Sequence, residues 1–472
     1  MRVERLSILV FIILIFSTVL EEVNSYSING NAVIRVPDDY LTIQDAIDVA
    51  KSGDTIVVGP GVYYETLYID KPLSLMGENR ENTIIIGSGH GSVIYISSDN
   101  VLLKGFTVKG SGNNYISPFD GGDAGIVLNS CKRCILSDLV VTGNCIGIFL
   151  NTSDGNIIKD NIVYSNSRDG IHLRMSNGNI IIRNNATLNR GHGGIYLNPY
   201  SSYNLIAGNT CGRNADHGIK LQDSSNHNIL RNNLLIDNEN AGIFLRKSDY
   251  NILYNNTCIG NRHNPGIILY ISCDNNIIAG NICISNDEGI SIQHSSNGNW
   301  LVNNFCLNNR VRGILLWSSS SNILVNNIIK WNGKDPYGTA GIYISDSSQI
   351  KIYYNNISMN WRGIVVEGDS SININIHYNN IMRNIEWGLI NKASREVNAT
   401  LNWWGDPSGP DICNVVEETD QQDPEEIKGN IAYNPWLIEP YKPGNILRYM
   451  DIRYPIWRTV KRTLLIIETL NY

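Results

Sequence analysis

Titratable side chains recur at a constant spacing in the first half of the chain, and their types suit acid–base chemistry. Arg168, His192 and Asp216 follow one another at steps of 24 residues, and the same step separates His172 from Tyr196. A histidine or tyrosine can take up a proton, and an arginine can hold an acid group in place. These types fit proton abstraction beside a sugar carboxylate, provided that the fold brings residues 24 apart together.

A Gly-Ile pair repeats along the chain and supplies that spacing. Its glycines are 22 to 24 residues apart with one step of 28, and they are Gly125, Gly147, Gly170, Gly194, Gly218, Gly242, Gly266, Gly289, Gly313, Gly341 and Gly363. Repeats of this length are typical of solenoids. Each unit contains short period-two alternations rich in isoleucine and no stripe of period 3.6. A leucine-rich repeat needs a helical segment in each unit, so the pattern favours an all-β, right-handed parallel β-helix with three short strands per coil of about 22–24 residues.

Asparagine marks a second position of the repeat. We expect these side chains to form a hydrogen-bonded ladder along the solenoid axis, because amides one coil apart can donate to and accept from each other. The predicted ladder contains Asn161, Asn185, Asn209, Asn233, Asn256, Asn281, Asn304, Asn327, Asn356 and Asn380, and it ends at Asn402. A third marker, Ser-x-x-Asn, runs from Ser153/Asn156 to Ser319/Asn322 and includes Ser272/Asn275.

Strand alternation predicts which side chains face the solvent. With the glycine of each Gly-Ile pair as position zero, the residues at plus one and plus three should point inward, and those at minus two, zero and plus two outward. Glycine at position zero would then leave a shallow groove along the axis. The alternative is that glycine serves a tight turn or a positive φ, with no groove.

The columns beside this groove supply the candidate site. We predict His192, Asp216 and Lys220 as catalytic residues, with His192 and Asp216 paired across one coil. The predicted ligand-binding residues are Arg168, His172, Arg174, Tyr196, His217, Arg246, Tyr337 and Trp361. Asp169, His217 and Glu288 lie one residue before a repeat glycine, where the alternation could already have given way to a turn. A solvated polar face without a ligand remains the alternative.

Two insertions lengthen coils on one edge of the proposed groove. They are residues 110–123, just before Gly125, and residues 332–340, just before Gly341. Long loops often carry function. Aromatic residues nearby, including Tyr337 and Trp361, offer faces that suit sugar rings.

Composition excludes several classes of protein. The formal net charge of −7 argues against a general nucleic-acid binder, and 42% hydrophobic residues can build a large core. Nine cysteines are too few for a disulfide scaffold of 472 residues. Cys131-Lys-Arg-Cys134 is one pair at zinc-like spacing, which leaves a metal ion or a disulfide open, and we predict no metal site.

The sequence near the N-terminus predicts export, and the segments on either side of the repeats predict caps for the β-helix. Arg2 and Arg5 precede an apolar stretch at residues 6–20, which is typical of a signal peptide over residues 1–25 or of an uncleaved membrane anchor. A capping helix at residues 42–51 should close the N-terminal end of a β-helix that spans residues 33–410. Residues 411–472 would form a C-terminal cap, an acidic loop, and a basic, apolar tail from Ile446 that either packs on the solenoid or touches a membrane.

Several segments resemble the NosD-like group of right-handed β-helix proteins. They are Leu41-Thr-Ile-Gln-Asp-Ala-Ile-Asp-Val-Ala, Gly53-Asp-Thr-Ile-Val-Val, Gly61-Val-Tyr-Tyr-Glu, Pro72-Leu-Ser-Leu-Met-Gly and the closing Asn402-Trp-Trp-Gly-Asp-Pro-Ser-Gly-Pro, together with the Gly-Ile-x-Leu repeats. The resemblance covers about residues 33–440 and implies the fold more strongly than an activity. The resemblance implies that the chain could bind carbohydrate or hydrolyse sugars, as members of the wider group do. It also implies an exported copper-accessory role. Copper or calcium follows from the resemblance alone, and no cofactor is otherwise expected.

Together these features predict an exported surface or periplasmic-type protein that binds carbohydrate along one face of the solenoid. Its partner would be an extracellular polysaccharide or glycoprotein, not nucleic acid. The first alternative is a lyase, epimerase or hydrolase acting on acidic glycans, and the second is the copper-accessory role. No complete catalytic motif decides whether the chain is an enzyme, and the oligomeric state is left open.

Overall fold

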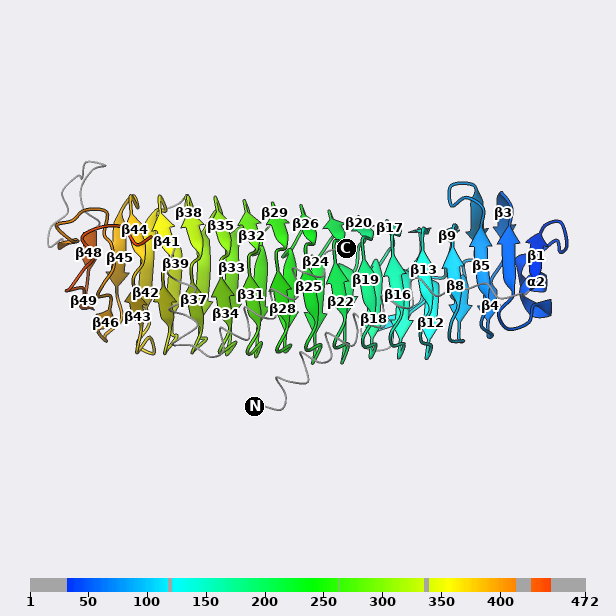
Figure 1. Cartoon of the computed structure of the whole chain (residues 1–472), viewed down its shortest axis with the longest axis horizontal. Coiled ribbons are helices and arrows are strands. Elements are labelled where there is room, and N and C mark those ends of the chain that lie inside the picture. The colour runs from blue at the N-terminus through cyan, green and yellow to red at the C-terminus, as the bar shows by residue number, and fades with distance from the viewer. Residues whose placement is uncertain (1–31, 118–120, 262, 335–338, 413–425, 443–472) are drawn as a thin grey trace.

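The chain winds into an elongated parallel β-helix, with its N-terminal coils at one end and its C-terminal coils at the other (Figure 1). The structure is a computed structural model that describes residues 32–117, 121–261, 263–334, 339–412 and 426–442. The predictions for residues 1–25, for Tyr337, for most of the acidic loop and for the tail from Ile446 fall outside the described residues.

Three parallel sheets form the walls of the solenoid. Sheet A contains β1 (Val33–Val36), β2 (Thr55–Val58), β5 (Ser74–Gly77), β8 (Leu102–Lys104), β13 (Ile135–Ser137), β16 (Ile157–Lys159), β19 (Ile180–Ile182), β22 (Leu205–Ala207), β25 (Ile229–Arg231), β28 (Ile252–Tyr254), β31 (Ile277–Ala279), β34 (Trp300–Val302), β37 (Ile323–Val325), β40 (Lys351–Tyr353), β43 (Asn375–His377), β46 (Val397–Asn398) and β49 (Ile431–Ala432). Sheet B contains β3 (Gly61–Tyr64), β6 (Thr83–Ile86), β9 (Thr107–Lys109), β14 (Val140–Thr142), β17 (Ile162–Tyr164), β20 (Asn185–Thr187), β23 (Thr210–Gly212), β26 (Leu234–Ile236), β29 (Thr257–Ile259), β32 (Ile282–Ile284), β35 (Phe305–Leu307), β38 (Ile328–Lys330), β41 (Asn356–Ser358) and β44 (Asn380–Met382). Sheet C contains β4 (Leu67–Ile69), β7 (Ile94–Ile96), β12 (Ala124–Asn129), β15 (Ile146–Asn151), β18 (Ile171–Arg174), β21 (Gly193–Leu197), β24 (His217–Gln222), β27 (Ile243–Arg246), β30 (Ile267–Tyr270), β33 (Glu288–Gln293), β36 (Arg312–Trp317), β39 (Ala340–Ser345), β42 (Arg362–Glu367), β45 (Trp387–Asn391), β47 (Asp411–Ile412) and β48 (Glu426–Lys428).

The core is a set of apolar columns that run along the axis. Ile195 and Leu197 pair in register with Ile219 and Leu221 of the next coil, and all four side chains are fully buried, as the Gly-Ile-x-Leu pattern predicts. Cysteines occupy the inward column of sheet B in place of larger residues: Cys211, Cys258, Cys283 and Cys306. Burial raises the pKa of the Cys211 thiol, so it stays neutral and packs as a small apolar group.

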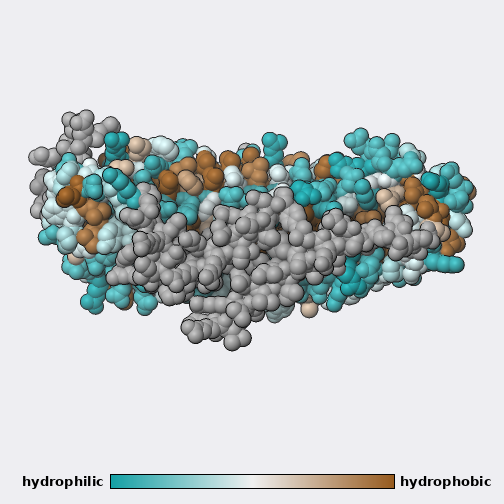
Figure 2. Space-filling model, viewed as in Figure 1, coloured by the Kyte–Doolittle hydropathy of each residue, from teal (hydrophilic) through white to brown (hydrophobic). Residues whose placement is uncertain are grey.

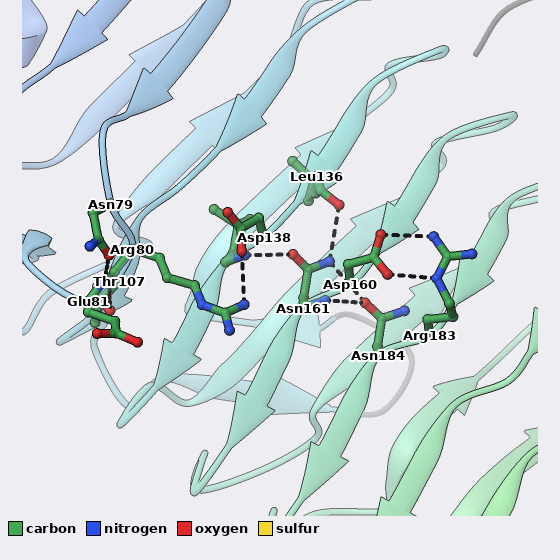
Figure 3. Close-up of polar contacts among 11 residues, drawn as sticks. Asn79, Arg80, Glu81, Thr107, Leu136, Asp138, Asp160, Asn161, Arg183 and Asn184 are labelled. Atoms are coloured by element: carbon green, nitrogen blue, oxygen red, sulfur yellow. Dashed lines mark hydrogen bonds and ion pairs between the residues drawn. The ribbon is translucent and has the colours of Figure 1, made fainter. Parts of the chain in front are cut away.

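Asparagine side chains close the corners of each coil by hydrogen bonds to the coils on either side. In Figure 3, the side-chain amide of Asn161 donates to the Leu136 carbonyl (3.0 Å) and to Asn184 Oδ1 (2.9 Å). The backbone N–H of Asn161 donates to the same Asn184 oxygen (3.1 Å). Each amide therefore satisfies backbone groups that the turn between two strands leaves without a partner. Comparable rows run along all three corners, including Asn144 to Asn384 and Asn156 to Asn322.

The ladder that the sequence predicts is shifted by one residue at three coils. The buried members are Asn184, Asn355 and Asn379, and not Asn185, Asn356 and Asn380. In each Asn-Asn pair here, the first residue caps the corner and the second begins the next strand of sheet B. The Ser272/Asn275 pair shifts in the same way to Cys273 and Asn276. Spacing alone does not say which of two adjacent candidates points inward.

The repeat glycines do not line a groove, which corrects the sequence prediction. A Cβ added to Gly218 would lie 2.7 Å from the Gly242 carbonyl oxygen and 2.9 Å from Cδ1 of the core residue Leu235. Position zero therefore points into the core, at the corner between sheets B and C. Its φ is not in the positive range, so glycine is needed here for lack of space and not for backbone freedom.

The N-terminal end of the solenoid is covered by the helix that the sequence predicts. Helix α2 (Ile43–Val49) begins at Thr42, whose Oγ1 accepts a hydrogen bond from the Asp45 N–H (3.1 Å), and it buries Ile43 and Ile47. At the other end Asn402 ends the ladder and Trp404 is fully buried. Strands β48 and β49 extend sheets C and A beyond residue 410. Among the described residues, no helix has the length and apolar character to cross a membrane.

Replacing Asn233 by Ala should lower the free energy of unfolding by about 1–3 kcal/mol. The change leaves the Ile206 carbonyl and the Asn209 N–H without their buried partners. Urea unfolding followed by circular dichroism measures the effect. Asn185→Ala is the matched control, because the Asn185 side chain is exposed at the start of β20. Equal unfolding midpoints for the two variants would contradict the role of the ladder.

Replacing Gly218 by Ala should destabilise the chain by about 2 kcal/mol or more, because the methyl group has no room at the corner. Gly59→Ala is the control, since its Cβ would make ordinary contacts at 3.4 and 3.8 Å. Thermal unfolding of both variants tests the difference, and a Gly218→Ala variant as stable as the control would refute the inward orientation.

Candidate functional site on sheet C

Three columns of side chains point outward from the face and the edge of sheet C. Because the repeat glycine points inward, the residue before it points outward, as at Asp169 and His217. The other two columns lie at minus two and plus two, where His192 adjoins Asp216, and Tyr196 adjoins Lys220, in successive coils. The polar members of the three columns converge over strands β18, β21 and β24.

Asp169 lies at the centre of this cluster and is fully buried. Its Oδ1 accepts a hydrogen bond from the His192 backbone N–H (2.6 Å) and lies 3.3 Å from His192 Nδ1. Its Oδ2 lies 3.2 Å from His172 Nδ1, which is close enough for an ion pair although the angle is poor for a hydrogen bond. Burial alone would raise the pKa of Asp169, but the two histidines outweigh it and hold the pKa below its usual range. Asp169 is therefore a fixed negative charge.

Aromatic rings form the floor beside this charge. Tyr196 stacks on His192 with ring centroids 4.9 Å apart, and it contacts His172 at 4.7 Å. Burial, followed by the charge of Asp169, raises the pKa of Tyr196, so its hydroxyl keeps its proton. That hydroxyl and the His172 ring nitrogens are buried and have no hydrogen-bond partner among the described residues. Buried polar atoms without a partner are costly and call for an explanation, such as a ligand.

The insertion at residues 110–123 covers the cluster. Its hairpin pairs β10 (Tyr115–Ser117) with β11 (Gly121–Gly122). The Tyr115 hydroxyl lies 3.5 Å from His192 Nδ1, and the Arg168 guanidinium carbon lies 4.5 Å from the centroid of the Tyr115 ring. Tyr115 reaches a coil 77 residues further along the chain. The length of the insertion was the signal in the sequence, but it did not identify Tyr115.

A second carboxylate, that of Asp216, contacts side chains of its own coil and of the next one. Asp216 accepts from Lys220 Nζ (3.3 Å) and from the Asn240 side chain, and it lies 3.3 Å from His217 Nε2. His217 Nδ1 accepts the Ala241 N–H (3.1 Å), which places its proton on Nε2, toward Asp216. Burial lowers the pKa of His217 to about 3, so this ring stays neutral. Lys220 Nζ also lies over the rings of Tyr196 (5.7 Å) and Phe244 (5.4 Å).

A hollow of about 530 Å³ adjoins the cluster at the edge between sheets B and C. Asn113 of the insertion and Ser167, which precedes Arg168, contribute to its wall. Arg190 and Arg213 line it together with Glu239. Two guanidinium groups in an open hollow favour an anionic or hydroxyl-rich ligand.

The structure gathers most of the predicted site residues but pairs them differently. The predicted pair of His192 with Asp216 is wrong: His192 pairs with Asp169, and Asp216 pairs with His217 and Lys220. The reason is that the column before the glycine also faces outward, so a nearer carboxylate is available. Asp169 was noted in the sequence but not selected, because a turn was expected at its position.

The remaining predicted ligand-binding residues lie further from Asp169. Arg174 donates to Asn151 Oδ1 (2.7 Å), and Arg246 lies 3.4 Å from Asp223 Oδ1. Trp361 donates to Glu386 Oε2 (2.9 Å) in a separate group. That group lies toward the C-terminal end of sheet C, where Arg312 pairs with Glu288 (2.6 Å). Its charges are neutralised locally.

The described residues contain no cluster of three or more metal-ligating side chains. Cys131 and Cys134 are both buried free thiols. The side-chain interaction with Cys131, followed by burial, raises the pKa of the Cys134 thiol, so it stays protonated. These two residues take the places of a serine and an asparagine in the corner rows: their backbone N–H groups donate to Ser153 and Asn156. A structural role accounts for both.

Sequence comparison assigns the chain to a family. The family described as "Right handed beta helix region" matches residues 124–270, 228–329 and 268–403. The chain belongs to this family of right-handed β-helix proteins, as its coil geometry requires. No curated protein matches its sequence.

Solved structures with a similar fold come from phages and bacteria. The Dettilon tailspike protein (gp208) shares 18% identity at a TM-score of 0.53, over 66% of this chain and 68% of that one. The bacteriophage phi29 gene product 12 N-terminal fragment shares 12% identity at 0.55, over 82% and 84%. The A-module of the Azotobacter vinelandii mannuronan C-5 epimerase AlgE6 shares 16% identity at 0.45, over 65% and 93%. At these identities the likeness shows the fold alone.

The folded chain should lose stability in mild acid, because His217 stays neutral in it while the same residue takes up a proton in the unfolded chain. The pKa of His217 in the folded chain, about 3, lies below the value of about 6.5 for an exposed histidine. The contribution of the neutral His217 to the free energy of unfolding is therefore complete above pH 6.5 and is lost as the pH falls toward 3. Between pH 7 and pH 5 the loss should be about 2 kcal/mol. His217→Gln should remove that part of the loss, since a glutamine can still accept from Ala241. Urea unfolding at both pH values measures it, and an identical loss in the variant would contradict a buried neutral His217.

Proposed function

We propose that this chain is an exported binding protein that recognises an acidic carbohydrate on the outer face of sheet C. The ligand would lie beside the partly exposed His192 and Lys220, next to the buried Tyr196 and at the hairpin that carries Tyr115. Residues 6–20, which follow Arg2 and Arg5, support export, and the partner would be an extracellular polysaccharide or glycoprotein.

One observation carries this proposal. The Tyr196 hydroxyl is fully buried and keeps its proton, yet it has no hydrogen-bond partner among the described residues. A sugar hydroxyl or carboxylate that reaches this hydroxyl after the side chains around it shift would accept from it and remove that cost. The stacked rings around the hydroxyl also match the way in which sugar rings pack on aromatic faces.

Charge favours an acidic ligand over a neutral one. Arg168 is exposed above Tyr115, and Arg190 and Arg213 line the adjoining hollow. Lys220 adds a cation that rings hold in place. Arg168, Arg190, Arg213 and Lys220 outnumber the carboxylates of Asp169, Asp216 and Glu239 in this region, although the chain as a whole is negative.

A second candidate is an enzyme acting on acidic glycans, favoured by the position of His192. Its Nδ1 lies between Asp169 and the Tyr115 hydroxyl, a setting that can move a proton. In an elimination, a base would take the proton next to the carboxylate, and the glycosidic bond would break as its oxygen gains a proton. The product would contain a new carbon–carbon double bond, whose absorbance separates turnover from binding.

The copper-accessory role that the NosD-like resemblance implies stays a third possibility, with no ligand cluster among the described residues to support it. Equilibrium dialysis against Cu(I) tests it directly. Retention of stoichiometric copper by the full chain would favour it over the carbohydrate proposal.

Tyr196→Phe should weaken binding of an acidic oligosaccharide about 3- to 10-fold, because it removes one hydrogen bond. Lys220→Met should abolish the preference for acidic over neutral glycans. A glycan array followed by calorimetry on the best ligand measures both. Arg310→Gln is the control, since its exposed ion pair with Asp287 lies further along the solenoid. No bound glycan, or equal affinities in all variants, would refute the proposal.

A further inference from the structure

The outer face of sheet A carries an apolar stripe, interrupted by Lys159, Arg231 and Lys351, that the carbohydrate proposal does not use. Two adjacent outward columns contribute to it along ten strands, from β13 to β40. They include Ile135, Ile157, Ile180, Leu205, Ile229, Ile252, Ile277, Trp300 and Ile323, together with Ile182, Ala207, Tyr254, Ala279, Val302, Val325 and Tyr353. We refer to these residues as the sheet A stripe. An apolar surface of this extent marks an interaction site.

The side chains of the sheet A stripe are little exposed to solvent, unlike those on the outer face of sheet B. Leu205 is 6% exposed, Ala279 1% and Val302 0%, although all three point away from the core. On sheet B, the outward residue Phe305 is 38% exposed. Figure 2 shows hydrophobic residues gathered in the open along the upper edge, over strands β26 to β38 of sheet B. Outward side chains of sheet C such as Leu315 (5%) and Val365 (0%) are as little exposed, so the occupant of the sheet A face is inferred from where the described chain ends.

The described chain ends at the C-terminal end of this stripe, where Tyr441 packs against the cluster that contains Tyr354 and the stripe residues Val325 and Tyr353. The Tyr441 ring packs on Tyr354 with centroids 4.7 Å apart. The Tyr441 N–H donates to Asn380 Oδ1 (2.8 Å), and its carbonyl accepts from Asn380 Nδ2 (3.1 Å). Both partners belong to the C-terminal coils. The chain therefore enters residues 443–472 from the C-terminal end of the sheet A stripe.

We propose that residues 443–472 dock on the sheet A stripe and run from β40 toward β13. The length is sufficient. Nine coil steps from β40 to β13 span about 43 Å, and 30 residues cover about 45 Å even in a helix and far more when extended. The segment is thus a strap that shields the apolar face from other molecules.

The composition of residues 443–472 complements the stripe. Its apolar residues are Ile446, Leu447, Met450, Ile452, Ile456, Trp457, Val460, Leu464, Leu465, Ile466, Ile467 and Leu470. Its basic residues are Arg448, Arg453, Arg458, Lys461 and Arg462. Carboxylates border the stripe in adjacent coils, because Asp249 and Asp274 lie three residues before β28 and β31. A basic, apolar segment fits an apolar stripe with an acidic border.

Cysteine accessibility tests the docking. In a full-length chain with Cys413→Ser, the other eight cysteines are buried. Ala279→Cys and Ala207→Cys then place probes at both halves of the stripe, and Thr257→Cys is the control on the outward column of sheet B. In the native full chain, a polyethylene-glycol maleimide should label both stripe probes at least about 10-fold more slowly than the control. In a chain that ends at residue 442, all three probes should react at similar rates.

The outcomes separate this occupant from others. Stripe probes that stay protected in the chain ending at residue 442 would overturn the proposal. Deprotection only on removal of residues 1–31 would assign the face to the N-terminal segment, and protection that falls on dilution would assign it to a second copy. If the shortened chain loses its β-sheet circular dichroism, the full-length double variant Leu464→Asp and Leu465→Asp replaces it. Unchanged protection in that variant would refute the docking equally.

Discussion

The whole molecule depends on successive coils lying flush at the spacing of hydrogen-bonded strands. The walls meet this requirement with backbone ladders, but the corners leave turn carbonyls and N–H groups that the strands cannot satisfy. Rows of asparagine solve the problem, because one side chain accepts from the preceding coil and donates in both directions. Asn209 illustrates the pattern: it donates to Asn233 Oδ1 and to the Ile181 carbonyl. The abundance of asparagine is therefore structural.

Flush stacking also explains the glycines and the position of the candidate site. At the corner between sheets B and C the backbone passes so close to the core and the asparagine row that no Cβ fits. This corner turns the residue before each glycine outward. Asp169 and His217 consequently face the same side as Tyr196 and Lys220, and carboxylates, histidines and aromatic rings from three coils gather there.

The solenoid presents different surfaces on its walls, each set by what stacks in its outward columns. Sheet C carries charged and aromatic side chains with buried polar atoms, whereas the outward columns of sheet A carry mostly apolar side chains. Because every coil contributes one position to each column, a function can spread along a wall without any change in the core. The hairpin at residues 110–123 departs from this rule, since Tyr115 crosses from one coil to another.

The repeat in the sequence is enough to predict the coil length, the positions of the strands, the capping helix after Thr42, the inward isoleucine and cysteine columns, and most of the residues that meet over sheet C. Periodicity suffices for these, because residues one repeat apart must become neighbours. Only the tertiary structure decided the choice of Asn184 over Asn185, the inward direction of the glycines, the partner of His192 and the reach of Tyr115. These depend on side-chain directions at corners and on contacts across coils, where the strand alternation ends and no repeat constrains the chain.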